Sequence, residues 1–417
     1  MHYFIYPTKD TWISSGSRKT GGPNTIGKAF TEQNFGKDEI LELKKEFYNL
    51  TFDYPTRVLV QFDLTEVSKS IEDLQSTNNQ ITPNVTDNVG SKFYLRLYEA
   101  EGNKELSSDY GISVHPISES WDGGRGKFGS SPQVKDGASW NYRKFPGGGS
   151  GISWEGKSSG SNYISSSGAG HVDSNTGLTN APGTLFATQK FSSSKPDVEV
   201  DVTSMTIAML SCSQAASGKG TGPEPDMTKR LRNHGRMLRF TGSQETKTEN
   251  FSQLKFLSSN TNTIYSPKLE FRWDDHIPAT GSNTGSLLEL TSSGLVENYV
   301  YQIGNKYEYK EDEKVKFRFG ARKRYIQKTF SRSVQEVSGS YIGFTSGSYS
   351  IVDVATGETK VPFSNYTTMS CDSTSNYFNQ WLNGFEADRI YKILVKVKYK
   401  DNQEQIFDND FEFKIKR

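Results

Sequence analysis

Hydrophobic and polar residues alternate with a period of two along most of the chain, which is typical of β-strands with one buried face. Residues 57–64 show the pattern most clearly, with apolar side chains at Val58, Val60, Phe62 and Leu64. The same alternation returns in residues 92–99, 198–203 and 268–273. We therefore expect antiparallel sheets that bury one face and leave the other in contact with water.

Helical spacing is confined to two short stretches. One contains Val67, Ile71 and Leu74, and the other covers residues 205–210. The predicted fold class is therefore mainly β.

A cluster of turn-forming residues interrupts the strand pattern at residues 278–285, over a longer distance than a hairpin requires. The chain has 417 residues, which is enough for more than one domain. We predict a β-sandwich domain over residues 1–277, a linker, and an immunoglobulin-like β-sandwich over residues 286–417. Alternation predicts the core of the second sandwich: Val315, Phe317, Phe319, Tyr391, Ile393, Val395, Val397, Phe411, Phe413 and Ile415.

Charge and cysteine content exclude several classes of protein. Lys and Arg total 49 against 48 Asp and Glu, so no global field attracts nucleic acid or an anionic membrane. The two cysteines, Cys212 and Cys371, fall in different predicted domains and form no disulfide framework. The N-terminal residues have neither a basic nor a long apolar segment, and no uncharged apolar run reaches transmembrane length. We expect neither secretion by a signal peptide nor membrane insertion, and no nucleic-acid partner.

The first predicted domain carries a series of short motifs in a fixed order: NFGKDEILEL, TRVLVQFDL, KFYLRLYE, VHPISESWDGG, GASWNYR, ISWEG, VEVDVTSM, GRMLRF and SPKLEFRW. In this order they resemble the DNRLRE family, over roughly residues 1–276. The resemblance implies a jelly-roll-like sandwich similar to carbohydrate-binding modules, in a family found in surface, secreted and phage-encoded proteins. Residues 68–91, 123–190 and 213–235 look like expansions of loops that are tighter in that family.

The stretch SESWDGGRGKF, residues 118–128, fits two interpretations. In the favoured one, Trp121 is an aromatic plug at the sandwich rim and the Asp-Gly-Gly step is a turn. In the other, four aromatic side chains share one rim and present flat faces to a sugar: Trp121, Trp140, Tyr142 and Trp154.

Candidate catalytic and metal-binding residues are sparse. The five histidines are isolated, without a zinc motif, and no P-loop, nucleotide fingerprint or nucleophile elbow is present. We therefore expect no enzymatic activity and no cofactor. Asp274 and Asp275 could hold a structural calcium ion, but an acidic entrance to the linker is the favoured interpretation. The basic run at residues 228–239 is assigned to a solvated strand face or an acidic protein neighbour rather than to nucleic acid.

The polar face of the second sandwich is rich in cations, which predicts a docking surface for an acidic partner formed by Lys314, Lys316, Arg318, Lys392, Lys396 and Lys398. Residues 146–183 are too poor in apolar side chains to form a core, and are expected to act as an arm that orders against a neighbouring subunit.

The whole layout, including the C-terminal residues 391–417, resembles virion structural proteins of marine tailed bacteriophages. The predicted function is a non-enzymatic structural protein of the neck, tail or baseplate, assembled in the host cytoplasm into the virion in several copies. Its partners would be other virion proteins and copies of itself. The alternative is a carbohydrate-binding or adhesion module that recognises host surface glycans.

Overall fold

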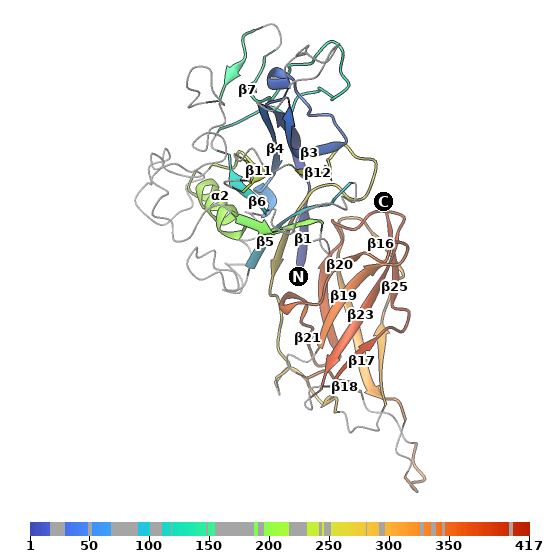
Figure 1. The fold of residues 1–417 in the computed structure, drawn as a ribbon. Coiled ribbons are helices and arrows are strands. Elements are labelled where there is room, and N and C mark those ends of the chain that lie inside the picture. Colours follow the sequence, from blue (N-terminus) through green and yellow to red (C-terminus); the bar gives the residue numbers. More distant parts are fainter. Residues whose placement is uncertain are drawn as a thin grey trace. The chain divides into compact units, whose positions relative to one another are not determined.

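A computed structural model of the chain describes residues 1–16, 30–48, 52–67, 91–100, 111–117, 119–146, 149–154, 187–190, 196–216, 232–241, 244–245, 252–280, 282–291, 297–325, 329–334, 339–343, 347–399 and 403–417 (Figure 1). Most of the predicted arm at residues 146–183 lies outside these residues. The same holds for most of the predicted loop expansions at residues 68–91 and 213–235, and for the first predicted helical stretch beyond Val67. The second helical stretch forms α2 (Thr203–Ala216), which is longer than predicted.

Strands dominate the described residues, so the predicted mainly β class is confirmed. One sheet has the order β1 (His2–Ile5), β13 (Lys268–Trp273), β5 (Ser91–Leu97) and β10 (Val198–Asp201). A second has the order β12 (Ser252–Leu257), β3 (Ile40–Tyr48), β4 (Phe52–Phe62), β11 (Arg236–Phe240), β6 (Gly111–Pro116) and β9 (Ala187–Lys190), with β2 (Pro7–Ser14) beside β4. A short hairpin joins β7 (Tyr142–Lys144) to β8 (Ile152–Ser153), and η1 (Phe30–Glu32) is a single 3-10 turn.

Two further sheets follow in the C-terminal part of the chain. The first has the order β14 (Leu288–Glu289), β18 (Ser340–Tyr341), β17 (Lys314–Lys323), β22 (Asn376–Trp381) and β21 (Ser370–Cys371), with β15 (Asn298–Ile303) beside β17. The other has the order β16 (Glu308–Lys310), β25 (Glu412–Lys416), β23 (Ile390–Lys398), β19 (Gly347–Asp353) and β20 (Thr359–Val361), with β24 (Glu404–Phe407) beside β23. A 3-10 turn, η5 (Asn365–Thr367), precedes β21.

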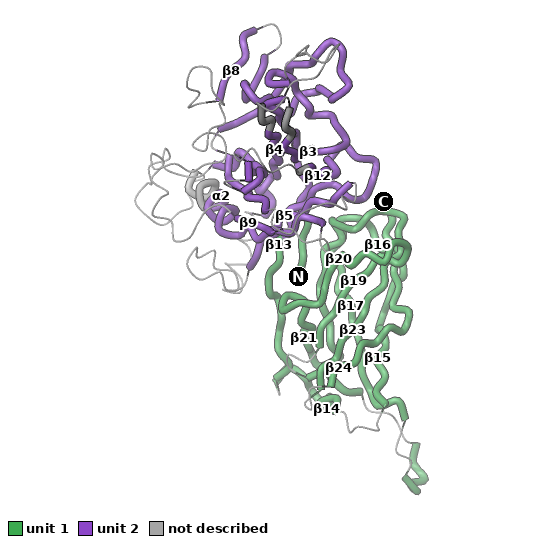
Figure 2. Tube along the Cα trace, viewed as in Figure 1, with its two compact units in different colours: residues 1–4, 271–417 green, residues 5–270 purple. Residues whose placement is uncertain are grey.

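The chain divides into two compact units (Figure 2). Unit 2 comprises Ile5–Glu270, and unit 1 comprises Met1–Phe4 together with Phe271–Arg417. The limit between the units therefore falls within β1 and within β13. Residues 1–4 and 271–277, which the sequence assigned to the first domain, group with unit 1.

Unit 1 is a β-sandwich whose two sheets bury a common core. All ten side chains predicted from the alternation of polar and apolar residues are at most 6% exposed and belong to this core. Aromatic rings fill its centre, where Phe317 lies 5.0 Å from Phe413 and 5.3 Å from Phe378 between ring centroids. Alternation within a strand was therefore a correct guide to these ten inward positions.

The first residues of the chain complete the core of unit 1. Phe4 is 3% exposed, belongs to the same core cluster, and meets Phe385 edge to face at 6.4 Å. Gln380 donates a hydrogen bond of 2.9 Å to the carbonyl oxygen of His2, and the N-terminal ammonium donates one of 2.6 Å to that of Trp273. Residues close to the two ends of the sequence are thus held in one sandwich.

The strand β13 and the part of β4 from Thr56 to Val60 are buried on both faces, so the expectation of one wet face is wrong for these segments. On β13, Lys268 and Glu270 are fully buried, and Glu270 forms an ion pair of 2.8 Å with Arg96. On β4, Arg57 is buried beside Trp140 and makes two hydrogen bonds with the Glu245 carboxylate, of 2.7 and 3.1 Å. Arg57 and Glu270 can occupy these positions because each has an oppositely charged partner that offsets the cost of removing it from water.

The loop that covers β4 is held by the side chain of Asn34, which is fully buried. Its amide nitrogen donates hydrogen bonds of 2.8 Å to the carbonyl oxygens of Gly123 and Ala138. Its amide oxygen accepts hydrogen bonds from the backbone nitrogens of Gly36 and Gly126, at 3.0 and 2.9 Å. One asparagine therefore satisfies four backbone groups from two segments that are far apart in the sequence.

We expect Asn34→Ala to lower the free energy of unfolding of unit 2 by at least about 3 kcal/mol, because it leaves several buried backbone groups without partners. Urea unfolding followed by tryptophan fluorescence measures this change. Asn141→Ala, at a partly exposed position of the same loop layer, is the control and should cost less than about 1 kcal/mol. Equal unfolding midpoints for the two variants would contradict the role assigned to Asn34.

We expect Phe4→Ala to destabilise unit 1 by about 3 to 5 kcal/mol, the usual cost of truncating a buried phenylalanine. Differential scanning calorimetry of the full chain measures the loss, and Ile406→Ala, at a position 54% exposed in the same unit, is the control. If unit 1 of the Phe4→Ala protein melts at the same temperature as unit 1 of the Ile406→Ala control, the N-terminal residues are not part of its core.

Candidate functional site

The exposed aromatic rim of the alternative interpretation does not exist as a surface, because its three tryptophans are buried. Trp121, Trp140 and Trp154 are at most 2% exposed and form a core cluster with Leu59 and Met237 of the β4 sheet. The indole nitrogen of Trp121 donates to the carbonyl oxygen of His234 at 2.7 Å. A ring that is buried on both faces offers nothing for a sugar to stack on, so these residues stabilise the loop layer.

Tyr142 is the one residue of this set that is partly exposed. Its ring meets Phe145 edge to face at 5.4 Å, and lies against the backbone of Gly151. Its ring therefore packs within its own hairpin.

The turn after Trp121 is architectural as well. Gly124 has φ +79°, and a Cβ atom there would lie 2.3 Å from Oδ1 of Asn34, so only glycine fits. The ammonium of Lys9 lies 4.6 Å from the centroid of the Trp121 ring and donates to the Trp121 carbonyl oxygen. Burial lowers the pKa of Lys9.

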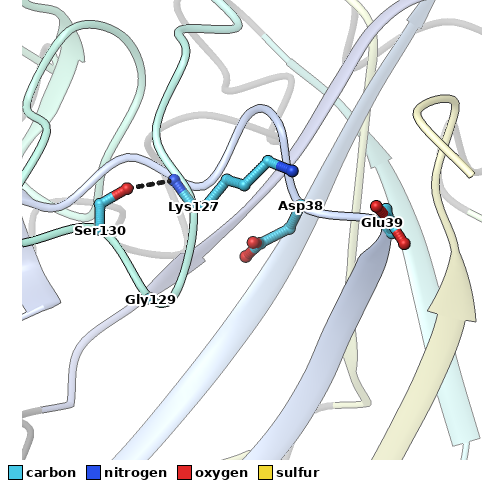
Figure 3. A pocket seen from close by; sticks show the side chains of 5 residues that line it. All are labelled: Asp38, Glu39, Lys127, Gly129 and Ser130. Atoms are coloured by element: carbon cyan, nitrogen blue, oxygen red, sulfur yellow. Dashed lines mark hydrogen bonds between the residues drawn. The ribbon is translucent and has the colours of Figure 1, made fainter.

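A hollow of about 490 Å³ lies beside the same loop (Figure 3), lined by Asp38, Glu39, Lys127, Gly129 and Ser130. The carboxylate of Asp38 accepts hydrogen bonds of 2.9 Å from the indole nitrogen of Trp12 and from the backbone nitrogen of Phe128. Burial raises the pKa of Asp38. Because both of its oxygens accept hydrogen bonds that hold the loop against the sheet, Asp38 has a structural role in this hollow.

Within the described ranges, no three histidine, cysteine or acidic side chains lie close enough together to hold a metal ion. Of the candidate calcium ligands, Asp274 accepts a hydrogen bond of 2.9 Å from the backbone nitrogen of His276. Asp275 lies 3.4 Å from the N-terminal ammonium in unit 1. No helix among the described residues is long and apolar enough to cross a membrane.

The six cations of the predicted docking surface form two groups. Lys314, Lys316 and Arg318 belong to β17, and the other three belong to β23 in the opposite sheet of the unit 1 sandwich. The alternate residues of both strands point into the common core. The cations of the two strands therefore point away from each other, and a single face that contains all six is excluded.

On the β23 side, lysines are paired with carboxylates. Lys392 lies 2.8 Å from Asp408, and Lys396 lies 3.7 Å from Glu404. The adjacent β25 follows the same scheme, with Lys416 paired to Glu308 at 2.5 Å. Lys398, at the end of β23, is exposed. Much of the positive charge of this sheet is balanced within the unit.

On the β17 side, cations lie against aromatic rings. Lys316 is 4.0 Å from the centroid of the Tyr377 ring, and Lys314 is 5.5 Å from that of Trp381. The third neighbouring strand contributes Tyr299, whose ring centroid is 5.0 Å from the Arg322 guanidinium. We refer to these side chains as the cation–aromatic face: Lys314, Lys316, Arg318 and Arg322 of β17, Tyr299 and Tyr301 of β15, and Tyr377 and Trp381 of β22.

Strand register produces this face. The pairing of β17 with β22 places Lys314 opposite Trp381 and Arg318 opposite Tyr377. The pairing with β15 places Arg322 opposite Tyr299. Directly opposed side chains lie about 5 Å apart at Cβ, within reach of a cation and a ring.

Arg318 is the member of the face that also has an acidic partner. Its guanidinium lies 2.8 Å from the carboxylate of Asp372. The hydrogen bond to Asp372 raises the pKa of Arg318.

The predicted docking surface contained three of the four cations of this face, Lys314, Lys316 and Arg318, but neither Arg322 nor the aromatic residues. Tyr299 and Tyr301 alternate in NYVYQI, and Tyr377 and Trp381 are four residues apart in NYFNQW, so their common side within each strand was visible. No local signal shows that both strands flank β17.

Comparison with models of known protein families finds no match, and a search of curated proteins finds no similar sequence.

We expect oxidation by N-bromosuccinimide to modify one of the six tryptophans rapidly in the folded protein, at Trp381. The other five are at most 5% exposed, whereas Trp381 is partly exposed. Loss of indole absorbance measures the number oxidised, and Trp381→Phe should abolish the fast phase. Rapid oxidation of Trp140 or Trp154 in the folded chain, located by peptide mass spectrometry, would contradict their burial.

Proposed function

We propose that the chain is a non-enzymatic structural protein of a tailed-bacteriophage virion, placed in the neck, tail or baseplate region in several copies. The proposal takes residues 1–276 as a DNRLRE-type sandwich and the C-terminal part as an immunoglobulin-like module. Other virion proteins and copies of the chain itself are its proposed partners. The order of sequence motifs and the β-sandwich architecture support this proposal.

The observation that carries the proposal of a binding role is the asymmetry of the unit 1 sandwich. Lys392 and Lys396 of the β23 side are paired with carboxylates, although Lys396 also lies 5.1 Å from the Phe363 ring, whereas Lys314 and Lys316 of the β17 side lie over aromatic rings. A cation that contacts a ring keeps its full charge and remains available to a partner. Tryptophan, tyrosine and arginine are also the residues that contribute most to recognition surfaces.

Rigidity is the second argument for binding. The cation–aromatic face lies on paired strands, with β17 hydrogen-bonded to neighbours on both sides and anchored by Phe317 and Phe319 in the core. Side chains held on such a sheet lose little conformational entropy when they bind. A virion protein needs a rigid surface with which to bind its partners, and the proposed function assigns this role to the cation–aromatic face.

Antibodies against the purified chain, applied to particles from a lysate in which its gene is expressed, test the virion proposal. Immunogold electron microscopy should place label at the neck, tail or baseplate, and mass spectrometry of purified particles should find several copies per virion. Particles from a deletion strain, complemented in trans, are the control. Purified particles without the chain would refute the proposal.

A further inference from the structure

We propose that the cation–aromatic face of unit 1 binds a linear polysaccharide whose repeat carries carboxylate groups. The inference deepens the proposed function and rests on it for the binding role of this face, but the chemistry of the ligand is argued from the face alone.

A pair of nearly parallel aromatic rings at one end of the face is the first observation. Tyr299 and Tyr301 have ring centroids 6.1 Å apart and ring planes only 16° from parallel. Tyr299 is 36% exposed and Tyr301 is partly exposed. Two nearly parallel rings on one face of a strand suit the flat side of sugar rings, whose C–H groups are attracted to the negative face of an aromatic ring.

A glycine allows Tyr301 to lie down on the sheet. Gly320 is opposite Tyr301 in the register, and a Cβ atom on Gly320 would lie 2.4 Å from Cζ of the tyrosine ring. Glycine inside a strand costs stability and commonly marks a close approach to the backbone. Here the space is occupied by the Tyr301 ring, which is thereby held flat against β17.

The cations continue from this aromatic surface along the same strand. Outward-facing residues of β17 recur about every 7 Å, so Lys314 and Lys316 form a short row of positive charge that leads to Arg318, which is paired with Asp372. A polymer with a negative charge on each repeat can pair with several members of such a row at once, which adds their contributions. A neutral polysaccharide would use the tyrosines alone.

The size of the face favours a linear chain over a folded acidic protein. Three strands of about 5 Å spacing and nine residues of about 3.3 Å rise give a surface of roughly 400 Å². A stable protein interface buries about 800 Å² on each partner. A single extended polymer that lies along β17 matches the smaller area, so an acidic protein is treated as the competing outcome.

Isothermal titration calorimetry of the full chain with oligomers of polygalacturonate, alginate and hyaluronate tests the proposal. We expect binding to at least one of them, weaker at higher salt, and at least about tenfold weaker for the neutral methyl ester of the same oligomer. Tyr301→Ala and the double variant Lys314→Ala/Lys316→Ala should each reduce affinity by about tenfold. Gly320→Ala, which keeps every ring and charge but displaces Tyr301, should weaken binding in the same direction.

The β23 side supplies a matched control within the same unit. Lys392→Ala/Lys396→Ala removes the same number of lysines from the opposite sheet and should leave affinity within about twofold. The melting temperatures of all variants are compared first. Where they differ, binding is measured well below the lowest melting temperature, so that a loss of affinity does not reflect unfolding. Polyglutamate of matched length represents an acidic protein segment.

Three results would overturn the proposal: no binding to any of the acidic oligomers, equal losses from the β17 and β23 variants, or polyglutamate bound as tightly as the sugars with no effect of Tyr301→Ala. The last result would identify the face as a surface for acidic peptides. Because the titration uses purified chain, it is independent of particle labelling. If the titration shows binding but purified particles lack the chain, the virion role is refuted and sugar binding stands. If the particles contain the chain but no acidic oligomer binds, the sugar proposal is refuted and the virion role stands.

Discussion

The architecture of unit 2 depends on the hydrogen bonds made by the buried side chain of Asn34. A sheet face that is covered by a loop, instead of by another sheet, brings irregular backbone into the interior, where every unpaired carbonyl or amide costs stability. Asn34 pairs four such groups, two with its amide nitrogen and two with its amide oxygen. With the loop fixed in this way, Trp121, Trp140 and Trp154 can be buried against β4.

The sequence predicted what faces the interior more reliably than what faces water. All ten residues that alternation assigned to the core of unit 1 are buried there, because a hydrophobic side chain on the inner face of a sandwich has no other favourable place. Polar residues at the other positions were less informative. Arg57 and Glu270 look like solvent-facing residues in sequence, but both are buried, because Glu245 and Arg96 arrive from distant segments to pair with them.

The candidate site shows the same limit of local patterns. Alternation shows that Lys316 and Lys396 both point outward, but it contains no information about which sheet each strand joins. Sheet membership is decided by long-range pairing, and here it sends β17 and β23 to opposite sides of one core. The tryptophans raise a related problem, since aromatic residues close together in sequence suit a buried cluster and an exposed surface equally well. Burial by the loop layer decides between them.

The two sides of the unit 1 sandwich show how residues of the same type can have different electrostatic consequences. Lys392 faces Asp408 and Lys396 faces Glu404, so the positive field of these lysines is largely cancelled at short range. Lys316 faces the π-system of Tyr377, which orients the ammonium group without neutralising it. A count of lysines would assign both sides the same affinity for anions. The partner that each lysine meets leaves Lys314 and Lys316 charged beside aromatic rings, and the register of β17 brings Tyr299 and Tyr301 onto the same face of the sheet.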